Sequence, residues 1–590
     1  MIIRKFFRNL LRKRAKYFQQ RQFIYLLSAV IGLAVGFAAV IIKNLVHFLQ
    51  EFLTEGLAGS FHHYLYFIFP ILGILLTVLY IRYINKRPVQ HGIPSVLYAI
   101  SKNRGMMRRH NLYSSILTSA LTVGFGGSVG LEGPTVATGA AIGSNIGRTL
   151  QLSYKEIVLL LACASAGAMS AIFKAPIAAI VFALEVIMVD LSVWSMIPLL
   201  ISSAVAGLTS YFFTGQNVLY AFDIQEPFKL SEIHFFILLG ILTGFVSVYF
   251  TRVYNFISSR FSKIKNPYEK LLIGGTILGV LIFLLPSLYG EGYEEINRSL
   301  HGDYFYLYTN TFYSSLSQNI WFSLLFLLLI ILFKSFATAL TFAAGGIGGI
   351  FAPSLFTGVN TGLFFAILVN QFGADISVSN FALVGMAGTI AGVIHAPLTA
   401  IFLIAELTGG HELFMPLMVA STISYATVRI FEKNSVYTVQ LAQRGELMTH
   451  DKDRNILLMM NVSELIETNF NKIHPDDTLG DLVKVIKKSK RNVFPVVDEE
   501  NYFQGIVKLD EIRNIMFETD LYDKTYVRDL MFMPQHTISM QEPMEEVARK
   551  FHDSGRYNIA VLRDGKYIGF VSRAKVFSSY RAMLKQFSDE

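Results

Sequence analysis

Long apolar runs alternate with short polar segments over the first three quarters of the chain. Several runs approach the roughly 20 residues that a helix needs to cross a bilayer, whereas others are shorter or are interrupted by Gly and Pro. The pattern therefore predicts a polytopic membrane protein in which some helices do not cross completely. The runs are Phe23–Ile42, Tyr66–Tyr80, Ile116–Phe125, Ile157–Ala171, Ser192–Phe213, Phe235–Phe250, Leu271–Leu285, Ile320–Leu340 and Phe381–Ile394.

Apolar character ends near residue 440, and the remaining sequence is charged and has the pattern of a soluble α/β module. The chain is therefore expected to contain a membrane part followed by a cytoplasmic tail. We predict a basic N-terminal segment at 1–22, a transmembrane domain at 23–447, a linker at 448–458 and two tail modules at 459–520 and 521–590.

Composition supports a membrane location and excludes several other classes. The 590 residues are 53% hydrophobic and only 16% charged, against about 25% charged in soluble domains. Residues 1–22 hold eight Lys and Arg and no acid, which predicts a cytoplasmic flank on anionic lipid, with both termini in the cytoplasm. This flank accounts for most of the net charge of +9, so the charge does not indicate that the protein binds nucleic acid. Cys163 is the single cysteine, which excludes an internal disulfide. The sequence has no HExxH motif or Cys/His cluster, so it does not predict a metal site.

An internal repeat divides the membrane part into two halves. The segment GGSVGLEGP at 126–134 matches GGIGGIFAP at 345–353, which lies 219 residues later. The segment APIAAIVFALE at 175–185 matches APLTAIFLIAE at 396–406, which lies 221 residues later. Repeats with glycine-interrupted segments at corresponding places predict a transport site at their interface, built from half-helix ends near the membrane midplane.

A second repeat lies in the tail, where residues 493–507 match residues 557–571 at an offset of 64. In each copy a helical segment precedes two strands around a turn, and another helix follows. Two such copies are expected to pack as one pseudo-symmetric module. The predicted helices are 479–489 and 510–518 in the first copy, and 543–554 and 574–584 in the second.

Three glycine- and proline-containing segments, at 90–95, 130–135 and 349–354, predict helix starts inside the membrane part. The N–H groups of a helix start attract anions, and they do so without the full charge of a buried lysine. Glu132 places a carboxylate at one of these starts. An ionised carboxylate at membrane depth needs donors around it, so Glu132 is expected to compete with an anion for the same place.

These motifs resemble the CLC family of chloride channels and chloride/proton exchangers, and the tail resembles its pair of CBS domains. The resemblance rests on GxEGP at 130–134, GIFAP at 349–353, GIP at 92–94, the AP…E segment of both repeats, and Tyr437. It covers nearly the whole chain. It implies an all-α polytopic membrane domain with an inverted repeat, a C-terminal α/β CBS pair, a homodimer with one pore per subunit, and a bacterial inner-membrane location. It implies transport of chloride rather than catalysis, with no other cofactor.

The same resemblance implies roles for individual residues. Glu132 would be the gating glutamate, whose carboxylate blocks the anion path until it is displaced or protonated. The amides of Ile350 and Phe351 would donate to the central anion, and the hydroxyl of Tyr437 would donate from the inner side. The implied anion-binding residues are His91, Gly92, Ile93, Gly130, Gly133, Gly349, Ile350, Phe351 and Tyr437.

Two departures from the family pattern bear on the transported ions. His91 stands where the family usually has a serine, and it either donates an N–H to the anion or turns aside. Val186 stands directly after Glu185, where exchangers usually carry an internal proton glutamate. Valine cannot relay a proton, so we predict a passive chloride channel, with a proton-coupled chloride exchanger that uses water or another group as the alternative. Glu185 and its repeat mate Glu406 are expected to pair with helix ends.

The CBS copies also depart from the nucleotide-binding pattern of their family. Asp510, Glu511 and Ser572 are the candidate nucleotide contacts. Lys508 replaces the usual hydroxyl of the first copy, and Lys575 replaces the usual acid of the second. The two replacements favour a structural tail that stabilises a dimer, with an adenine nucleotide site as the alternative. A membrane anchor for a metabolite-binding tail is disfavoured, because an anchor has no use for Glu132.

Overall fold

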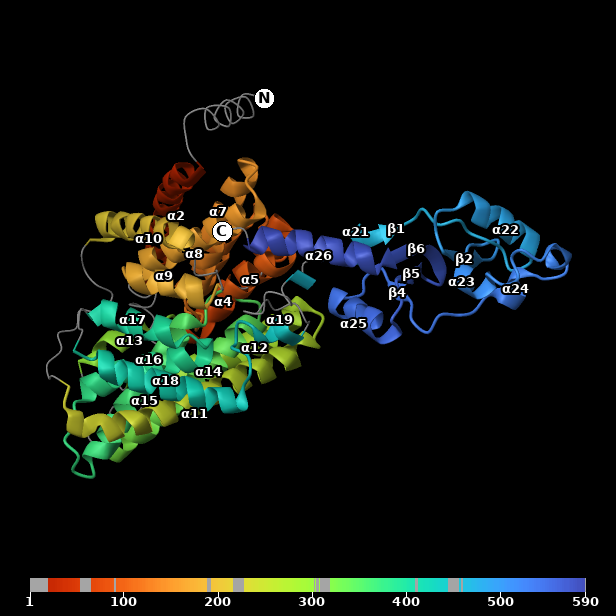
Figure 1. Ribbon diagram of the computed structural model, residues 1–590. Helices are drawn as coiled ribbons and strands as arrows, with labels where there is room; N and C mark the ends of the chain where they lie inside the picture. Colours follow the sequence, from red (N-terminus) through yellow and green to blue (C-terminus); the bar gives the residue numbers. More distant parts are fainter. Residues whose placement is uncertain are drawn as a thin grey trace. The chain divides into compact units, whose positions relative to one another are not determined.

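The computed structural model describes residues 20–53, 65–89, 92–187, 193–215, 228–301, 303, 307, 319–408, 412–443, 456–457 and 460–588. The chain divides into two compact units, Met1–Leu447 and Met448–Glu590. The first unit is helical and the second contains both helices and strands (Figure 1).

The helical unit consists of two series of helices in the same order. The first series is α2 (Gln20–Glu51), α4 (Leu65–Leu79) with the π-helical turn η3 (Tyr80–Asn85), α5 (Gly92–Lys102), α6 (Asn111–Gly124), α7 (Glu132–Thr149), α8 (Tyr154–Phe173), α9 (Pro176–Glu185) and α10 (Val193–Thr214). The second series is η4 (Leu230–Glu232), α11 (Ile233–Ser262), α12 (Pro267–Leu284), η5 (Pro286–Leu288), α13 (Tyr293–Leu300), α14 (Ile320–Ala343), α15 (Phe351–Asn370), α16 (Val378–Ile394), α17 (Pro397–Thr408), α18 (Phe414–Phe431) and α19 (Val439–Gln443).

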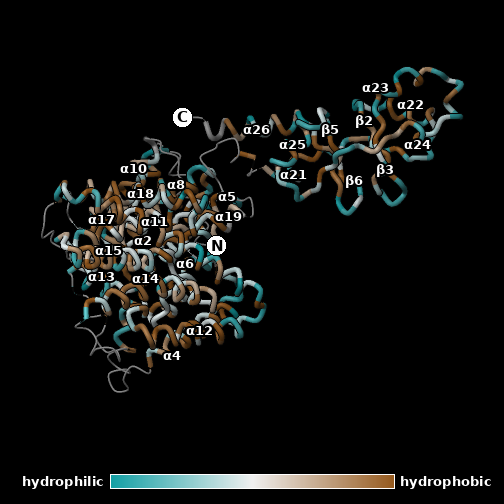
Figure 2. Tube along the Cα trace, turned by 90° about the horizontal axis from the view of Figure 1, so that it is seen from below, coloured by the Kyte–Doolittle hydropathy of each residue, from teal (hydrophilic) through white to brown (hydrophobic). Residues whose placement is uncertain are grey.

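Nine helices among the described residues are long and apolar enough to cross a membrane, which agrees with the predicted polytopic architecture. Figure 2 shows the apolar character running along helices such as α4 and α12. Two of the nine, α15 and α18, are absent from the predicted runs, because Ser, Thr, Asn and Gly residues interrupt their apolar sequence. Conversely, the predicted runs at 116–125 and 381–394 fall in the shorter helices α6 and α16.

The packing of the helices repeats between the two halves. Helix α2 packs on α10 and α8, and α11 packs in the same way on α18 and α16. Small residues allow the close approach in both places. A methyl group at Gly36 of α2 would lie 2.7 Å from Cβ of Thr209 in α10, and one at Gly244 of α11 would lie 2.7 Å from Cβ of Thr427 in α18. The duplication predicted from the motifs is thus a structural repeat.

The two halves run in opposite directions where their glycine motifs meet. Gly130 and Gly349 form an antiparallel bridge. The amide of Gly130 donates to the carbonyl of Gly349 at 2.9 Å, and the amide of Gly349 donates to the carbonyl of Gly130 at 2.7 Å. A reciprocal antiparallel pair is what two halves of opposite direction form where they meet, in agreement with the inverted repeat that the CLC resemblance implied.

The second unit consists of two similar copies that exchange a strand. Its elements are α21 (Val462–Leu465), β1 (Ile466–Glu467), α22 (Leu479–Lys488), β2 (Val493–Val497), β3 (Phe503–Lys508), α23 (Leu509–Ile512), η8 (Thr519–Leu521), α24 (Val527–Leu530), β4 (Ile538–Ser539), α25 (Met544–Ser554), β5 (Asn558–Arg563), β6 (Lys566–Ser572) and α26 (Arg573–Ser588). One sheet has the order β1-β6-β5-β4 and the other pairs β2 with β3. Because β1 of the first copy pairs with β6 of the second, the copies form one module.

One predicted helix of the tail is much shorter than expected. The prediction placed a helix at 510–518, whereas α23 ends at Ile512 and the following residues form turns. The hydroxyl of Tyr522 donates to the carbonyl of Met516 at 2.9 Å, and Ile515 packs against the core of the first copy. These tertiary contacts hold the segment in turns, which the local pattern did not indicate.

Candidate functional site

Three helix starts converge in the centre of the helical unit. Helix α7 begins at Glu132, α15 begins at Phe351 and α5 begins at Gly92. There is no space for side chains where they meet, since a Cβ at Gly92 would lie 2.7 Å from Cα of Gly133, and a Cβ at Gly349 would lie 2.8 Å from the amide nitrogen of Gly133. The first N–H groups of these helices have no partner within the helix, so the arrangement favours a negative charge.

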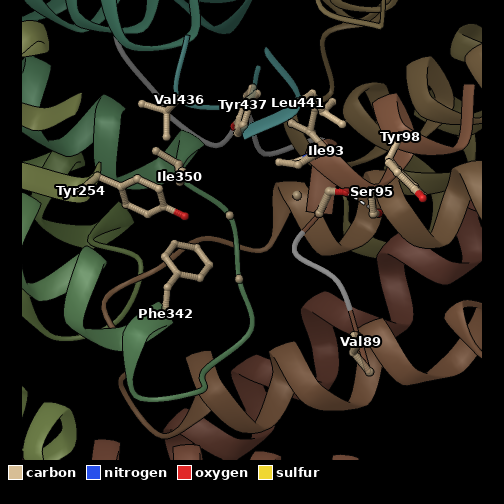
Figure 3. Close-up of a pocket in the computed structure, with 15 residues that line it drawn as sticks. Val89, Ile93, Ser95, Tyr98, Tyr254, Phe342, Ile350, Val436, Tyr437 and Leu441 are labelled. Atoms are coloured by element: carbon tan, nitrogen blue, oxygen red, sulfur yellow. Dashed lines mark hydrogen bonds between the residues drawn. The ribbon is translucent and has the colours of Figure 1, made fainter. Parts of the chain in front are cut away.

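A cavity of about 300 Å³ opens beside these helix starts. Figure 3 shows Ile93, Ile350, Tyr254 and Tyr437 around the same space. The hydroxyl of Tyr437 is buried without a hydrogen-bond partner among the described residues. An unpaired buried donor is costly, and an anion in the cavity would satisfy it. The cavity is lined by Val89, Gly92, Ile93, Pro94, Ser95, Tyr98, Gly133, Tyr254, Phe342, Gly348, Gly349, Ile350, Val436, Tyr437 and Leu441.

The carboxylate of Glu132 lies next to the cavity but not in its lining. Glu132 is fully buried. Its Oε1 atom accepts a hydrogen bond from the hydroxyl of Tyr293. Its Oε2 atom has no hydrogen-bond partner among the described side-chain contacts. This atom fills the space next to Gly130, since a Cβ at Gly130 would lie 2.2 Å from it and 2.8 Å from Cβ of Ala352. The carboxylate therefore occupies the position beside the Gly130–Gly349 pair, at the start of α15.

The structure places six of the nine predicted anion-binding residues in the cavity lining and separates others from it. The six are Gly92, Ile93, Gly133, Gly349, Ile350 and Tyr437. Gly130 and Phe351 are not in the lining, and His91 lies outside the described residues.

The amides of two of the predicted anion-binding glycines are already paired within the protein. The amides of Gly130 and Gly349 donate to each other's carbonyl groups, so they have no hydrogen left for an anion. An anion-binding role for these two glycines stays a prediction, and it would have to use the close approach of their backbone rather than their amides. The side chain of Phe351 is fully buried and its ring centroid lies 5.2 Å from that of Phe173, so only its backbone can contribute.

The acids of the AP…E segments cap helices of the opposite half. Glu185 accepts from the amides of Leu398 and Thr399 at 3.2 and 2.8 Å. Glu406 accepts from the amides of Ile177 and Ala178 at 3.1 and 2.9 Å. Each carboxylate thus satisfies the start of the other half's helix, and both acids pair with helix ends as the sequence suggested.

Sequence analysis missed a group of charged residues beside Glu132. The amide of Leu131 donates to Glu291 at 3.0 Å. Lys334 of α14 is fully buried and donates to the carbonyls of Leu288 and Gly290 at 3.4 and 3.2 Å. A signal was present, because Lys334 is a charge inside a predicted membrane run, and such residues are functional candidates by default.

The candidate nucleotide residues of the tail are engaged with protein partners. Asp510 pairs with Arg513 at 2.7 Å. Ser572 donates to Glu467, which also accepts from Arg491 at 2.6 Å. Partial burial raises the pKa of Glu467, but the hydrogen bonds from Ser572 and Arg491 outweigh it and hold this pKa below its ordinary value.

Glu511, the third of these candidates, lies 3.4 Å from Lys508. The hydroxyl of Ser572, the candidate in the second copy, is committed to Glu467.

The membrane-length helices and the converging helix starts define an integral membrane transport protein. A family model described as "Voltage gated chloride channel" matches residues 72–429, and the CBS domain model matches 462–518 and 527–581. The chain thus belongs to the CLC family of anion transporters, and its tail is a CBS pair.

Known relatives are similar over most of the membrane unit. A ClcB-like chloride channel protein of Ralstonia nicotianae is 28% identical over 434 residues, which cover 71% of this chain and 97% of the relative. The H(+)/Cl(-) exchange transporter ClcA of Vibrio vulnificus is 26% identical over 71% of this chain and 89% of its own length. The crystal structure of a slow cyanobacterial Cl-/H+ antiporter has a TM-score of 0.61 at 21% identity, and covers 72% of this chain and 98% of that chain.

Proposed function

We propose that this protein exchanges chloride for protons across the membrane, and that Glu132 both blocks the anion path and carries the proton. The observation that carries the proposal is the buried carboxylate of Glu132, which lies at the helix starts where an anion would bind. A carboxylate and an anion compete for such a place. Protonation removes the charge of the carboxylate, so it frees the place for the anion and loads a proton at the same time.

The names of two of the three similar proteins support exchange over the passive channel that the sequence favoured, whereas the Ralstonia protein is named as a chloride channel protein. The similar Vibrio protein is named an H(+)/Cl(-) exchange transporter, and the similar cyanobacterial structure is an antiporter. The observation in favour of a channel is Val186, which is buried and has no proton to give. We therefore retain the channel as the second candidate.

The cavity offers a proton route that does not require an acid at position 186. Its volume of about 300 Å³ has room for an anion together with several water molecules. The hydroxyl-bearing residues Tyr98, Tyr254 and Tyr437 line it, and so does Gly133, the neighbour of Glu132 in the chain. Water in this space would bring a proton close to Glu132, which is the alternative that the sequence left open for an exchanger without the internal acid.

Proton coupling can be measured directly with the full chain in liposomes. A chloride gradient is imposed with no pH gradient, and the internal pH and the chloride efflux are recorded together. We expect chloride movement to drive protons in the opposite direction, against their own gradient once a small one has built up. Chloride efflux with no proton movement at any membrane potential would establish the channel instead.

The assembly and location implied by the family remain part of the proposal. We propose a homodimer in a bacterial inner membrane, with cytoplasmic termini and a structural CBS tail. Ile177 of α9 and Leu398 of α17 occupy equivalent positions of the two halves, and both are 53% exposed. The two helices pack on each other, so they offer one apolar surface to lipid or to a second copy. Native mass spectrometry of the detergent-solubilised chain tests the dimer.

A further inference from the structure

Glu132 and its neighbour Leu131 are both held by one segment of the opposite half. Tyr293, the first residue of α13, donates its hydroxyl hydrogen to Oε1 of Glu132. Two residues earlier, Glu291 accepts from the amide of Leu131 at 3.0 Å. The side chain of residue 132 and the backbone that carries it are therefore both bound by the segment at 288–293.

This segment is itself fixed on both sides. The amide of Gly290 donates to the carbonyl of Gly126 at 3.1 Å, which ties the segment to the glycine loop before α7. The buried ammonium of Lys334 donates to the carbonyls of Leu288 and Gly290 at 3.4 and 3.2 Å. A hydroxyl on a segment held in this way keeps its place while a carboxylate moves toward it or away from it.

We propose that Tyr293 is a positioning residue of the gate, and that its hydroxyl holds the ionised carboxylate of Glu132 in the blocking place beside the Gly130–Gly349 pair. The inference rests on the gating role proposed above for Glu132. A hydrogen bond to an ionised acceptor is stronger than one to a neutral acid. The Tyr293 hydroxyl thus stabilises the blocked, ionised state more than the protonated state, and opening breaks this bond.

Other titratable groups around Glu132 also affect the equilibrium between its ionised and protonated states. Lys43 of α2 and Glu291 interact electrostatically with Glu132, and so does Tyr437 after α18. Lys334 interacts electrostatically with Glu295 of α13 and with Glu291. Tyr293 is the residue among these whose side chain forms a hydrogen bond with Glu132 within the described residues, so its removal changes the gate without changing the local charge.

The test is the pH dependence of chloride flux in liposomes for Tyr293→Phe, a substitution that removes one oxygen and keeps the ring. We expect the pH of half-maximal flux to move upward by about one unit, because a charge-assisted hydrogen bond of ordinary strength corresponds to a shift of that order. Flux at neutral pH is expected to rise about tenfold at most. A profile that coincides with that of the unmodified protein would overturn the role of Tyr293.

Tyr289 provides a matched control in the same part of the chain. Its hydroxyl is buried and has no hydrogen-bond partner among the described residues. Tyr289→Phe makes the same chemical change four residues away, and it is expected to leave the pH profile where it was. An equal shift in Tyr289→Phe would show that the effect is a general loosening, and would also overturn the proposal.

Glu132→Gln separates this inference from the proposed function. If Glu132 is the gate, the single variant has a flat pH profile and the double variant Tyr293→Phe/Glu132→Gln is identical to it. A flat Glu132→Gln profile with an unshifted Tyr293→Phe profile rejects the inference alone. A pH response that survives in Glu132→Gln rejects the gating role, and the role of Tyr293 with it. Elution of each variant at the position of the unmodified protein in size-exclusion chromatography confirms that it is folded.

Discussion

The starts of α7 and α15 have the same backbone and different side chains. Leu131 precedes α7 with φ −92° and ψ −13°, and Ile350 precedes α15 with φ −91° and ψ −13°. The residue that follows is Glu132 in one half and Phe351 in the other. The duplicated backbone thus makes two anion-favouring helix starts, and the carboxylate of the proposed gate, Glu132, is present at only one of them.

The surroundings of the two side chains differ as much as the side chains do. The carboxylate of Glu132 meets the hydroxyl of Tyr293, whereas the ring of Phe351 packs on Phe173 with centroids 5.2 Å apart. By contrast, Glu185 and Glu406 cap each other's helices in nearly the same way. In this protein, the carboxylate caps that both halves keep stabilise the fold, and the buried carboxylate that one half alone has is the candidate for transport.

The largest expected effect is that of Glu132→Gln, which removes the titratable charge that only one of the two helix starts carries. Without a titratable carboxylate the protein has no group to carry the proton, so chloride-driven proton movement should vanish while chloride flux persists at every pH. Liposome measurements of both ions test this. The matched change in the other half, Phe351→Leu, should retain proton coupling and cost less than about 1.5 kcal/mol of stability. Loss of proton coupling in Phe351→Leu would contradict the conclusion that only the helix start with Glu132 carries the proton.

The paired glycines allow a second test, because a methyl group meets different neighbours in the two halves. At Gly130 the added Cβ would lie 2.2 Å from Oε2 of Glu132 and 2.8 Å from Cβ of Ala352. The carboxylate can swing away, but the Cβ of Ala352 is fixed to α15 and has to shift slightly. Gly130→Ala should therefore fold with a smaller loss of stability than a methyl group against backbone would cause, and it should raise chloride flux at neutral pH severalfold.

At Gly349 the added Cβ would meet backbone, the amide nitrogen of Gly133 at 2.8 Å. Backbone cannot yield in this way, so Gly349→Ala should destabilise the unit by about 1–3 kcal/mol, the usual range for overpacking. Flux assays and thermal unfolding in detergent distinguish the two outcomes. Equal loss of stability in both variants would contradict the asymmetry.

Smaller and equal effects are expected where the halves are alike. Glu185→Gln and Glu406→Gln each remove the charge of a helix cap, which is worth about 0.5–2 kcal/mol. Both should lower the temperature of unfolding by similar amounts, and neither should change the ratio of chloride to protons moved. A change in that ratio in one variant alone would give its acid a role in transport.

The smallest effect concerns the tail, whose two copies have Lys508 in the first and Ser572 in the second at equivalent positions. Ser572→Ala removes a hydrogen bond to Glu467, which should cost the tail less than about 1 kcal/mol because the pair is partly solvated. The pKa of Glu467 is lowered in the folded state, so its contribution to stability is present at neutral pH and is lost as the pH falls through the folded value.

Thermal unfolding of the full chain, followed at pH 7 and again in mild acid, tests this last prediction. The difference between Ser572→Ala and the unmodified protein should shrink as the pH falls. Lys508→Ala should cost at most about 1 kcal/mol, since Lys508 is partly buried, lies 3.4 Å from Glu511 and stands 5.0 Å from the ring centroid of Phe532. A difference that grows in acid would mean that Glu467 is not the partner through which Ser572 acts.

Much of the site could be predicted because its backbone conformations require particular residues. Close packing of Gly92 against Gly133 leaves no room for a side chain, and proline marks the first turn of α7 and α15. The same local chemistry placed Glu132 at a helix start. Helix α15 itself was missed as a membrane span, because burial within the protein rather than contact with lipid allows its polar residues.

The amino-acid sequence by itself determined the repeat, the three helix starts and the acid at one of them, because glycine, proline and apolar periodicity act over a few neighbouring residues. Only the tertiary structure decided what surrounds that acid. Tyr293 lies 161 residues away from Glu132 in the chain, and Lys334 lies further still. No local pattern encodes such pairings, since they arise when the two halves fold against each other in opposite directions and their glycine loops join.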